Sequence, residues 1–330
     1  MEQQAIITVK DLRTYFYSDK RCNKVLNGVS FELYKGRTLC VVGESGCGKS
    51  VTASSIMQLL PKLSRIESGA ITYHSEKGDI RIDQLPRNGK EMRALRGRDI
   101  AMIFQDPMTS LNPVLTVGEQ IAEVIRLHDK CSKDEAAKRA GDMLELVGIP
   151  AERSGEYPHQ FSGGMKQRVV IAIALACSPE LLIADEPTTA LDVTIQAQVL
   201  ELMRKLKAEL NTSTILITHD LGVVAEMCDK VAIMYCGMIM EYGTLRDVYK
   251  NPAHPYTQGL FDSLPDLDTE VPRLKPIPGM VPDPTELPAG CPFENRCARA
   301  TERCKTECPK LRTLSGTHTV RCHNVEEGEQ

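Results

Sequence analysis

The chain has 330 residues, enough for one large domain with an extension or for two domains. Apolar residues make up 42% and charged residues 25%, as in ordinary soluble globular proteins, and no stretch approaches the roughly 20 apolar residues of a membrane span. The net charge of −4 argues against a general nucleic-acid binder, and the amino-terminal residues lack the pattern of a secretory signal. We therefore expect a cytosolic chain that reaches a membrane only through a partner.

The first half of the chain changes from strand-like to helical patterning. Apolar side chains at Val29, Phe31 and Leu33 repeat at period two, and residues 39–42 form a short apolar strand before a glycine-rich loop. From about residue 92 the apolar spacing becomes helical, with a clear stripe over residues 136–147. We expect an amino-terminal β region followed by a helical insertion over about residues 90–170.

The glycine-rich loop reads GESGCGKS over residues 43–50, the pattern G-x-x-x-x-G-K-[ST] between a predicted strand and a predicted helix. Its glycines allow successive N–H groups to point at phosphate oxygens, and the helix N-terminus adds partial positive charge. Lys49 is expected to reach the β- and γ-phosphates, and the Ser50 hydroxyl to coordinate Mg²⁺. A glycine-rich turn can match by chance, but the flanking elements favour a nucleotide site. The predicted ATP contacts are Gly43, Glu44, Ser45, Gly46, Cys47, Gly48, Lys49, Ser50 and Val51.

Three apolar strands follow, over residues 181–184, 214–218 and 231–235, with a helical segment between the first two. This order indicates a parallel sheet covered by helices. Two acids end the first of these strands: Asp185 is positioned to hold Mg²⁺ through water, and Glu186 to orient or deprotonate the attacking water. Acids at a strand end are common, but a phosphate loop in the same chain favours the catalytic interpretation.

Residues 161–168 read FSGGMKQR, with Ser-Gly-Gly leading into a helix upstream of the acidic strand. This segment resembles the signature of ABC ATPases. Other family motifs occur in the family's order: Gln105 resembles the Q-loop residue, residues 190–192 the D-loop, and His219 the switch histidine. The resemblance covers roughly residues 5–250.

The resemblance implies an α/β P-loop ABC ATPase core in residues 1–250, with a mostly parallel sheet, an amino-terminal antiparallel β region and a helical subdomain. In this family Glu186 and His219 would serve hydrolysis, Gln105 would join the Mg²⁺ ligands, and Phe16 would stack on adenine. The signature and D-loop would act on ATP held by the opposite subunit, through Ser162, Gly163, Gly164, Met165 and Asp192. Phe161 and Met165 replace the family's usual Leu and Gln, but the phosphate-contacting Ser and Gly residues are intact.

Residues 104–113, 184–198 and 251–260 resemble the ATPases of dipeptide and oligopeptide importers. The resemblance implies a second ATPase subunit (usually a paralogue), two membrane permeases and an extracytoplasmic peptide-binding protein, with this chain peripheral at the cytoplasmic face of the membrane. Nickel importers share much of the pattern, so the solute stays open. A soluble ABC protein of translation or DNA repair is disfavoured by the single phosphate loop and signature, and a non-hydrolysing nucleotide binder by Glu186 and His219.

Residues 251–330 hold eleven of the 19 prolines, which predicts an irregular extension. Seven of the twelve cysteines are scattered before residue 237, and we expect them to be mostly small buried hydrophobes rather than disulfides. Five crowd into the extension. Four of them, Cys291, Cys297, Cys304 and Cys322, follow the spacing C-x5-C-x6-C-x17-C, with Cys308 as a bystander. Similar importer ATPases carry this spacing, and the resemblance suggests a [4Fe–4S] cluster on these four cysteines. A zinc site and free thiols remain alternatives.

Overall fold

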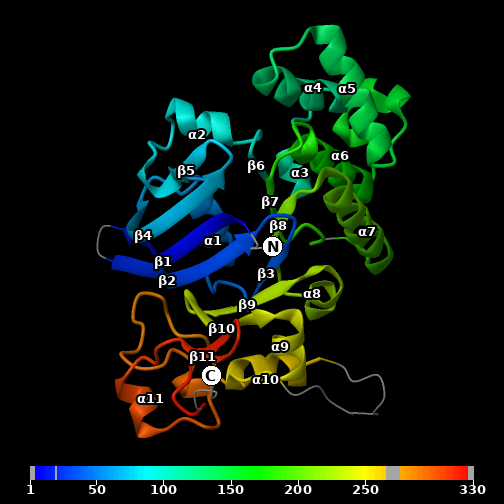
Figure 1. Ribbon diagram of the computed structural model, residues 1–330. Coiled ribbons are helices and arrows are strands. Elements are labelled where there is room, and N and C mark those ends of the chain that lie inside the picture. Colours follow the sequence, from blue (N-terminus) through cyan, green and yellow to red (C-terminus); the bar gives the residue numbers. More distant parts are fainter. Residues whose placement is uncertain (1–3, 19–20, 190, 265–275, 326–330) are drawn as a thin grey trace. The chain divides into compact units, whose positions relative to one another are not determined.

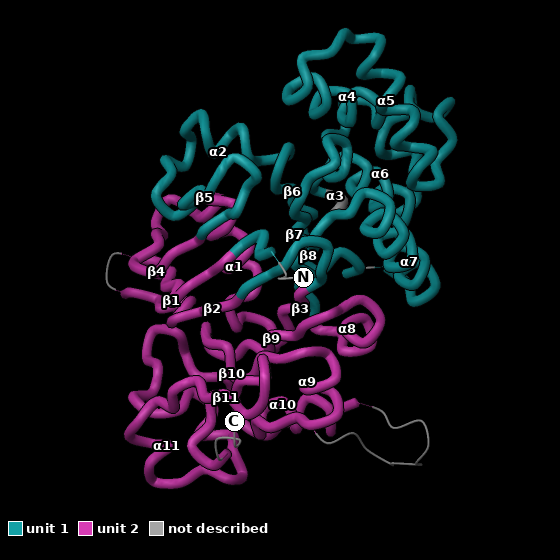
Figure 2. The backbone as a smooth tube through the Cα atoms, viewed as in Figure 1, with its two compact units in different colours: residues 1–7, 32–38, 72–218 teal, residues 8–31, 39–71, 219–330 magenta. Residues whose placement is uncertain are grey.

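The computed structural model describes residues 4–18, 21–189, 191–264 and 276–325 (Figure 1). The chain divides into two compact units, shown in teal and magenta in Figure 2. The first unit comprises residues 1–7, 32–38 and 72–218, and the second comprises residues 8–31, 39–71 and 219–330. Each unit draws on distant parts of the sequence, so the chain passes between them several times.

The first unit contains three parallel strands, in the order β8-β7-β6. They are β6 (Ile100–Ile103), β7 (Leu181–Asp185) and β8 (Ser213–Thr218), and all pair in parallel. Every residue of β7 and β8 is buried, as expected for apolar strands covered on both faces. Asp185 therefore ends, and Glu186 directly follows, a strand that its neighbours fix on both sides.

Helices make up most of the rest of the first unit. The α4 helix begins with a capping box, in which Thr116 and Glu119 satisfy each other's backbone N–H groups, and α5 buries the predicted stripe at Ala136, Ala140 and Leu144. None of the helices in the described residues is long and apolar enough to cross a bilayer. The helices are α2 (Lys90–Leu95), α3 (Pro107–Ser110), α4 (Val117–His128), α5 (Lys133–Leu146), α6 (Gly163–Leu175) and α7 (Val193–Leu210).

The second unit contains most of the amino-terminal sheet, in which β2 (Arg21–Tyr34), β1 (Ala5–Ser18) and β4 (Ser64–Ser75) are neighbours in that order. The last residues of β4 belong to the first unit and pair antiparallel with β5 (Gly78–Arg81). These long strands confirm the predicted amino-terminal β region.

A second set of strands in this unit includes β3 (Thr38–Val42), β9 (Lys230–Tyr235) and β10 (Met238–Thr244). The β3 and β9 strands are parallel, and β10 turns back antiparallel to β9. Four helices of this unit are α1 (Lys49–Ile56), α8 (Leu221–Met227), α9 (Leu245–Lys250) and α10 (Pro255–Asp262). The α1 helix begins at the predicted phosphate loop.

The carboxy-terminal extension is more regular than its proline content suggests. Besides α10 it contains α11 (Glu302–Thr306), β11 (Arg312–Ser315) and β12 (His318–Val320), and β12 pairs antiparallel with β10. Glu241 of β10 is fully buried and accepts hydrogen bonds from the His318 ring (2.8 Å) and from the backbone N–H groups of Ala253 (2.8 Å) and His254 (2.9 Å). The described part of the extension is therefore anchored on the edge of β10.

One expectation about the cysteines is wrong. Cys40 of β3 and Cys228, which ends α8, form a disulfide with their Cα atoms 5.9 Å apart. The two residues are 188 positions apart in the sequence, so no local pattern marks them as partners. The other scattered cysteines are free thiols, and Cys47 and Cys236 among them are buried.

Candidate functional site

The phosphate loop connects β3 to α1 in the second unit. Gly48 caps α1 with a φ of 104°, a left-handed conformation that a side chain would strain. At Gly43 a Cβ atom would lie 2.1 Å from the backbone oxygen of Met234 on β9, so only glycine fits there. The loop is also tied to the β9–β10 turn, since the Gly237 N–H donates to the Cys47 oxygen at 2.9 Å. These constraints place the α1 N-terminus at the end of the glycine loop, as the motif predicts.

Lys49 lies within the curl of this loop. Its residue surface is only 5% exposed, and its Nζ donates to the backbone oxygens of Gly43 (2.7 Å) and Glu44 (3.1 Å). Next to it, burial raises the pKa of the Cys47 thiol, so this cysteine is a neutral packing residue rather than a nucleophile. The ammonium group is thus held against the backbone at the start of the loop, which suits a phosphate contact.

Two of the predicted site residues meet at the end of β7 in the first unit. The Gln105 side-chain amide donates to Oε2 of Glu186 at 3.0 Å, and the Thr189 hydroxyl donates to the same oxygen at 3.0 Å. Glu186 has a φ of 48°, unusual for a residue with a side chain, while its N–H is held by the Ile217 oxygen at 2.9 Å. Strained backbone of this kind clusters at functional sites. Asp185, just before it, is 5% exposed.

The signature serine caps a helix in the first unit. Ser162 is the N-cap of α6 and, with Gly163, is exposed, and its side chain makes no capping hydrogen bond. Gly164 is packed against α7, because a Cβ atom there would lie 2.5 Å from Cγ2 of Ile195. The helix N-terminus therefore presents a serine hydroxyl and backbone N–H groups at the surface of this unit, the geometry of an anion site.

The two departures from the family signature contact the same arginine. The Arg153 guanidinium lies 4.4 Å from the centre of the Phe161 ring, and its Nη1 is 3.6 Å from Sδ of Met165. A bidentate pair with Glu156 holds this guanidinium in place. Phe161 and Met165 thus form one local cluster with Arg153, which sequence reasoning missed.

The remaining predicted residues lie on three separate elements. Asp192 caps α7, accepting from the Ile195 N–H at 3.0 Å, while Ala190 of the D-loop lies outside the described residues. His219 is exposed and directly follows β8. Phe16 is half-buried on β1, and the alternation of the strand places it on the face opposite Tyr17, whose ring packs against Arg65.

Four of the carboxy-terminal cysteines line one cavity of about 10 Å³, room for about one water molecule. Burial raises the pKa of the Cys291 thiol to about 12 and also raises the pKa values of Cys297 and Cys322, with neighbouring cysteines adding to the shift. Within the described ranges, no three His, Cys, Asp or Glu residues gather closely enough to hold one metal ion. The four thiols line the same cavity but, as they stand, lie too far apart to share one metal ion. They are Cys291, Cys297, Cys304 and Cys322.

Comparisons with known proteins agree with this geometry. The sequence matches the ABC transporter family over residues 26–189 and the oligopeptide/dipeptide transporter C-terminal region over residues 240–304. It is 51% identical to the dipeptide transport ATP-binding protein DppD of Bacillus subtilis, over 97% of this chain and 94% of the relative. It is 49% identical to the oligopeptide transport ATP-binding protein AppD of the same organism, over 98% of this chain and 97% of the relative.

Solved structures show the same fold. The dimeric ATP-binding cassette MJ0796 bound to ADP and Pi superposes with a TM-score of 0.64 at 26% identity, covering 73% of this chain and 99% of that one. The subunit cbiO1 of the cbiONQ transporter complex from Clostridium perfringens superposes with a TM-score of 0.61 at 27% identity, covering 76% of this chain and 92% of that one.

Proposed function

The chain belongs to the ABC transporter family of ATP-binding proteins, and we propose that it is the ATP-hydrolysing subunit of an importer for dipeptides and oligopeptides. The observation that carries the catalytic part is the carboxylate of Glu186, which Gln105 and Thr189 hold at the end of a buried strand. A carboxylate fixed in this way can orient a water molecule for attack on a phosphate. The peptide specificity rests on the relatives, which are named for dipeptide and oligopeptide transport.

For the ATP site we propose that the loop residues 43–51 cradle the triphosphate, with Lys49 as the charged contact and Phe16 against adenine. Ser50, Gln105 and Asp185 would hold Mg²⁺, whose chemistry is to neutralise developing phosphate charge. The buried Lys49 and Asp185 fit this assignment, because buried charges are retained where a ligand or partner offsets them. His219 would sense the γ-phosphate.

We further propose that ATP is covered by the signature of a second ATPase subunit. Support comes from Ser162 and Gly163, which are exposed at the N-terminus of α6. Gly164, Met165 and Asp192 would complete that surface. The predicted boundaries, an ATPase region in residues 1–250 with a helical subdomain near 90–170 and an extension in 251–330, belong to the same proposal.

The other partners we propose are two membrane permeases and an extracytoplasmic peptide-binding protein, which would keep this chain at the cytoplasmic face of the membrane. The second subunit would be a paralogue. Import of nickel or another small solute by the same machinery is the alternative, because the permeases and the binding protein choose the solute. Transport assays on the assembled complex with dipeptides, oligopeptides and Ni²⁺ separate these cases.

The cysteines of the extension support a second proposal, that Cys291, Cys297, Cys304 and Cys322 bind one [4Fe–4S] cluster. Their position around one cavity supports this, and binding would require the thiols to move closer together. When bound, such a cluster would crosslink the extension through its thiolates. Iron and visible absorbance in anaerobically purified full-length protein would support the cluster. Zinc alone, or four free thiols with no metal, would contradict it.

The catalytic proposal is tested with Glu186→Gln in the assembled transporter. We expect ATP hydrolysis to fall by about a thousandfold, as for loss of a group that acts in the transition state, while ATP binding persists and a closed, ATP-bound dimer accumulates. Hydrolysis at the wild-type rate in this variant would remove Glu186 from the reaction.

A further inference from the structure

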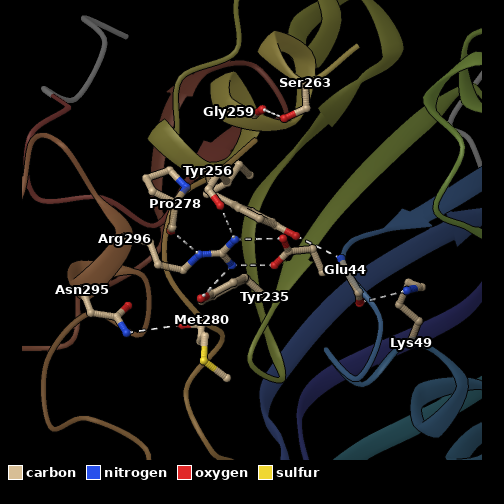
Figure 3. A network of polar contacts seen from close by, with 11 residues as sticks. Glu44, Lys49, Tyr235, Tyr256, Gly259, Ser263, Pro278, Met280, Asn295 and Arg296 are labelled. Atoms are coloured by element: carbon tan, nitrogen blue, oxygen red, sulfur yellow. Dashed lines mark hydrogen bonds and ion pairs between the residues drawn. The ribbon is translucent and has the colours of Figure 1, made fainter. Parts of the chain in front are cut away.

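Glu44 of the phosphate loop is held at its backbone N–H, at its backbone oxygen and at its carboxylate (Figure 3). Its backbone N–H donates to the Tyr256 hydroxyl at 3.0 Å, and its backbone oxygen accepts from Lys49. Its carboxylate forms a bidentate ion pair with Arg296, at 2.6 Å from Nη1 to Oε2 and 3.0 Å from Nη2 to Oε1. Tyr256 and Arg296 both belong to the carboxy-terminal extension, more than 200 positions from the loop.

The Arg296 side chain is buried and uses all of its hydrogen-bond donors. Its side chain is 3% exposed, and besides the two bonds to Glu44 it donates to the backbone oxygens of Pro278 (3.0 Å) and Ile277 (3.3 Å) and to the Tyr235 hydroxyl (3.3 Å). These five bonds use all five N–H groups of the guanidinium. A buried arginine with every donor used is costly to place and can adopt only one geometry, so the Glu44 carboxylate is fixed with it.

Packing of aromatic rings fixes the positions of Tyr256 and Arg296 relative to each other. Tyr256 is fully buried on α10, and its ring centre lies 4.7 Å from that of Tyr235 and 5.3 Å from that of Phe293. Phe293 lies three residues before Arg296 and also packs on Tyr235, at 5.3 Å between ring centres. Figure 3 shows Tyr235, Tyr256 and Arg296 on the same side of Glu44.

We propose that Arg296 and Tyr256 are positioning residues for the phosphate loop, so that the carboxy-terminal extension sets the affinity of this chain for MgATP. The proposal rests on the ATP-binding role proposed above for residues 43–51. Two physical effects support it. Arg296 neutralises and withdraws a carboxylate that would otherwise repel a triphosphate, and Tyr256 fixes an amide at the start of the loop, which lowers the ordering cost of binding.

The test measures MgATP and MgADP binding to the purified full-length chain by calorimetry, together with thermal unfolding without nucleotide. We expect Arg296→Ala to weaken MgATP binding by about tenfold or more, since it leaves the Glu44 carboxylate uncompensated beside the phosphates. Tyr256→Phe removes only the hydroxyl and should weaken binding by about threefold. Arg296→Lys keeps the charge without the bidentate geometry and should fall between wild type and Arg296→Ala.

Two further variants separate positioning from general stability. Arg303→Ala breaks an exposed pair with Glu307 in the same extension and should leave MgATP affinity unchanged. The double variant Glu44→Gln with Arg296→Ala should bind MgATP no more weakly than Arg296→Ala alone, because the uncompensated charge is gone. In the assembled transporter Arg296→Lys should raise the KM for ATP with little change in kcat.

Wild-type MgATP affinity in Arg296→Lys and Tyr256→Phe would overturn the proposal. These two variants decide the question even if Arg296→Ala does not fold. A lowered unfolding temperature with unchanged affinity of the folded protein would also overturn it, because that is the signature of a purely structural role. Lys49→Ala distinguishes this failure from failure of the ATP site itself. If Lys49→Ala abolishes MgATP binding while the extension variants bind normally, the ATP site stands and only the positioning role falls.

Discussion

The α1 and α6 helices both have a glycine at the N-terminus, Gly48 as the cap of α1 and Gly163 as the first residue of α6, but the chain surrounds these N-termini very differently. The loop before α1 is contacted by β9, by the β9–β10 turn and by two residues of the carboxy-terminal extension. At α6, Ser162 and Gly163 are exposed. The N-terminus of α1 is thus enclosed by contacts within its own unit, whereas that of α6 is exposed at the surface of its unit.

The largest difference between the two N-termini is expected at Lys49. Lys49→Ala removes the buried ammonium from the first site and should weaken MgATP binding to the isolated chain at least about a hundredfold, because a charge-assisted contact to phosphate is lost. Calorimetric titration measures this directly. Lys166→Ala, in the first turn of α6, serves as the matched control and should leave the affinity unchanged; an equal loss in both variants would contradict the comparison.

Two glycines of the phosphate loop differ in how closely other atoms approach them. A Cβ atom at Gly43 would lie 2.1 Å from the Met234 oxygen, so Gly43→Ala should lower the free energy of unfolding by about 2–3 kcal/mol and displace the loop. A Cβ atom at Gly46 would meet no other atom within 4 Å, but this glycine has a φ of 79°, so Gly46→Ala should cost only about 1 kcal/mol. Chemical denaturation ranks the two variants, and a larger loss in Gly46→Ala would show that contacts do not hold the loop.

Acid should destabilise the part of the carboxy-terminal extension that contacts the phosphate loop. Burial lowers the pKa of His254 to about 4, against an upward pull from Glu241, so the folded chain takes up this proton less readily than the unfolded chain. Stability from His254 is therefore complete above the unfolded pKa of about 6.5 and is lost as the pH falls toward 4. We expect the free energy of unfolding to fall by about 2 kcal/mol between pH 7 and pH 5. Chemical denaturation at both pH values measures this loss, and His254→Gln should reduce the dependence of the free energy of unfolding on pH.

Local patterns predicted the parts of the fold and site that are contiguous in sequence. The phosphate loop follows β3 and begins α1, the acids end β7, and Ser162 caps α6, because each depends on a short run of residues with a fixed backbone requirement. The family resemblance assigned both Gln105 and Glu186 to the site, but it did not predict the hydrogen bond between them.

Sequence patterns could not predict contacts between distant residues. The pair of Glu44 with Arg296 joins residues 252 positions apart, and the Cys40–Cys228 disulfide joins residues 188 apart. Likewise, β12 is a three-residue strand whose pairing with β10 depends on the buried Glu241 and His318. Such pairings follow from packing of the whole unit, and proline content says only that long helices are absent.

We expect this chain to bind ATP with its own loop and to hydrolyse it only when a second subunit supplies the signature. Ser162→Ala separates these two steps when MgATP binding is measured on the isolated chain and hydrolysis on the assembled transporter carrying the change in every ATPase subunit. Unchanged binding with hydrolysis reduced by about a hundredfold or more is the predicted result. Hydrolysis at the wild-type rate, or binding lost in the isolated chain, would contradict it.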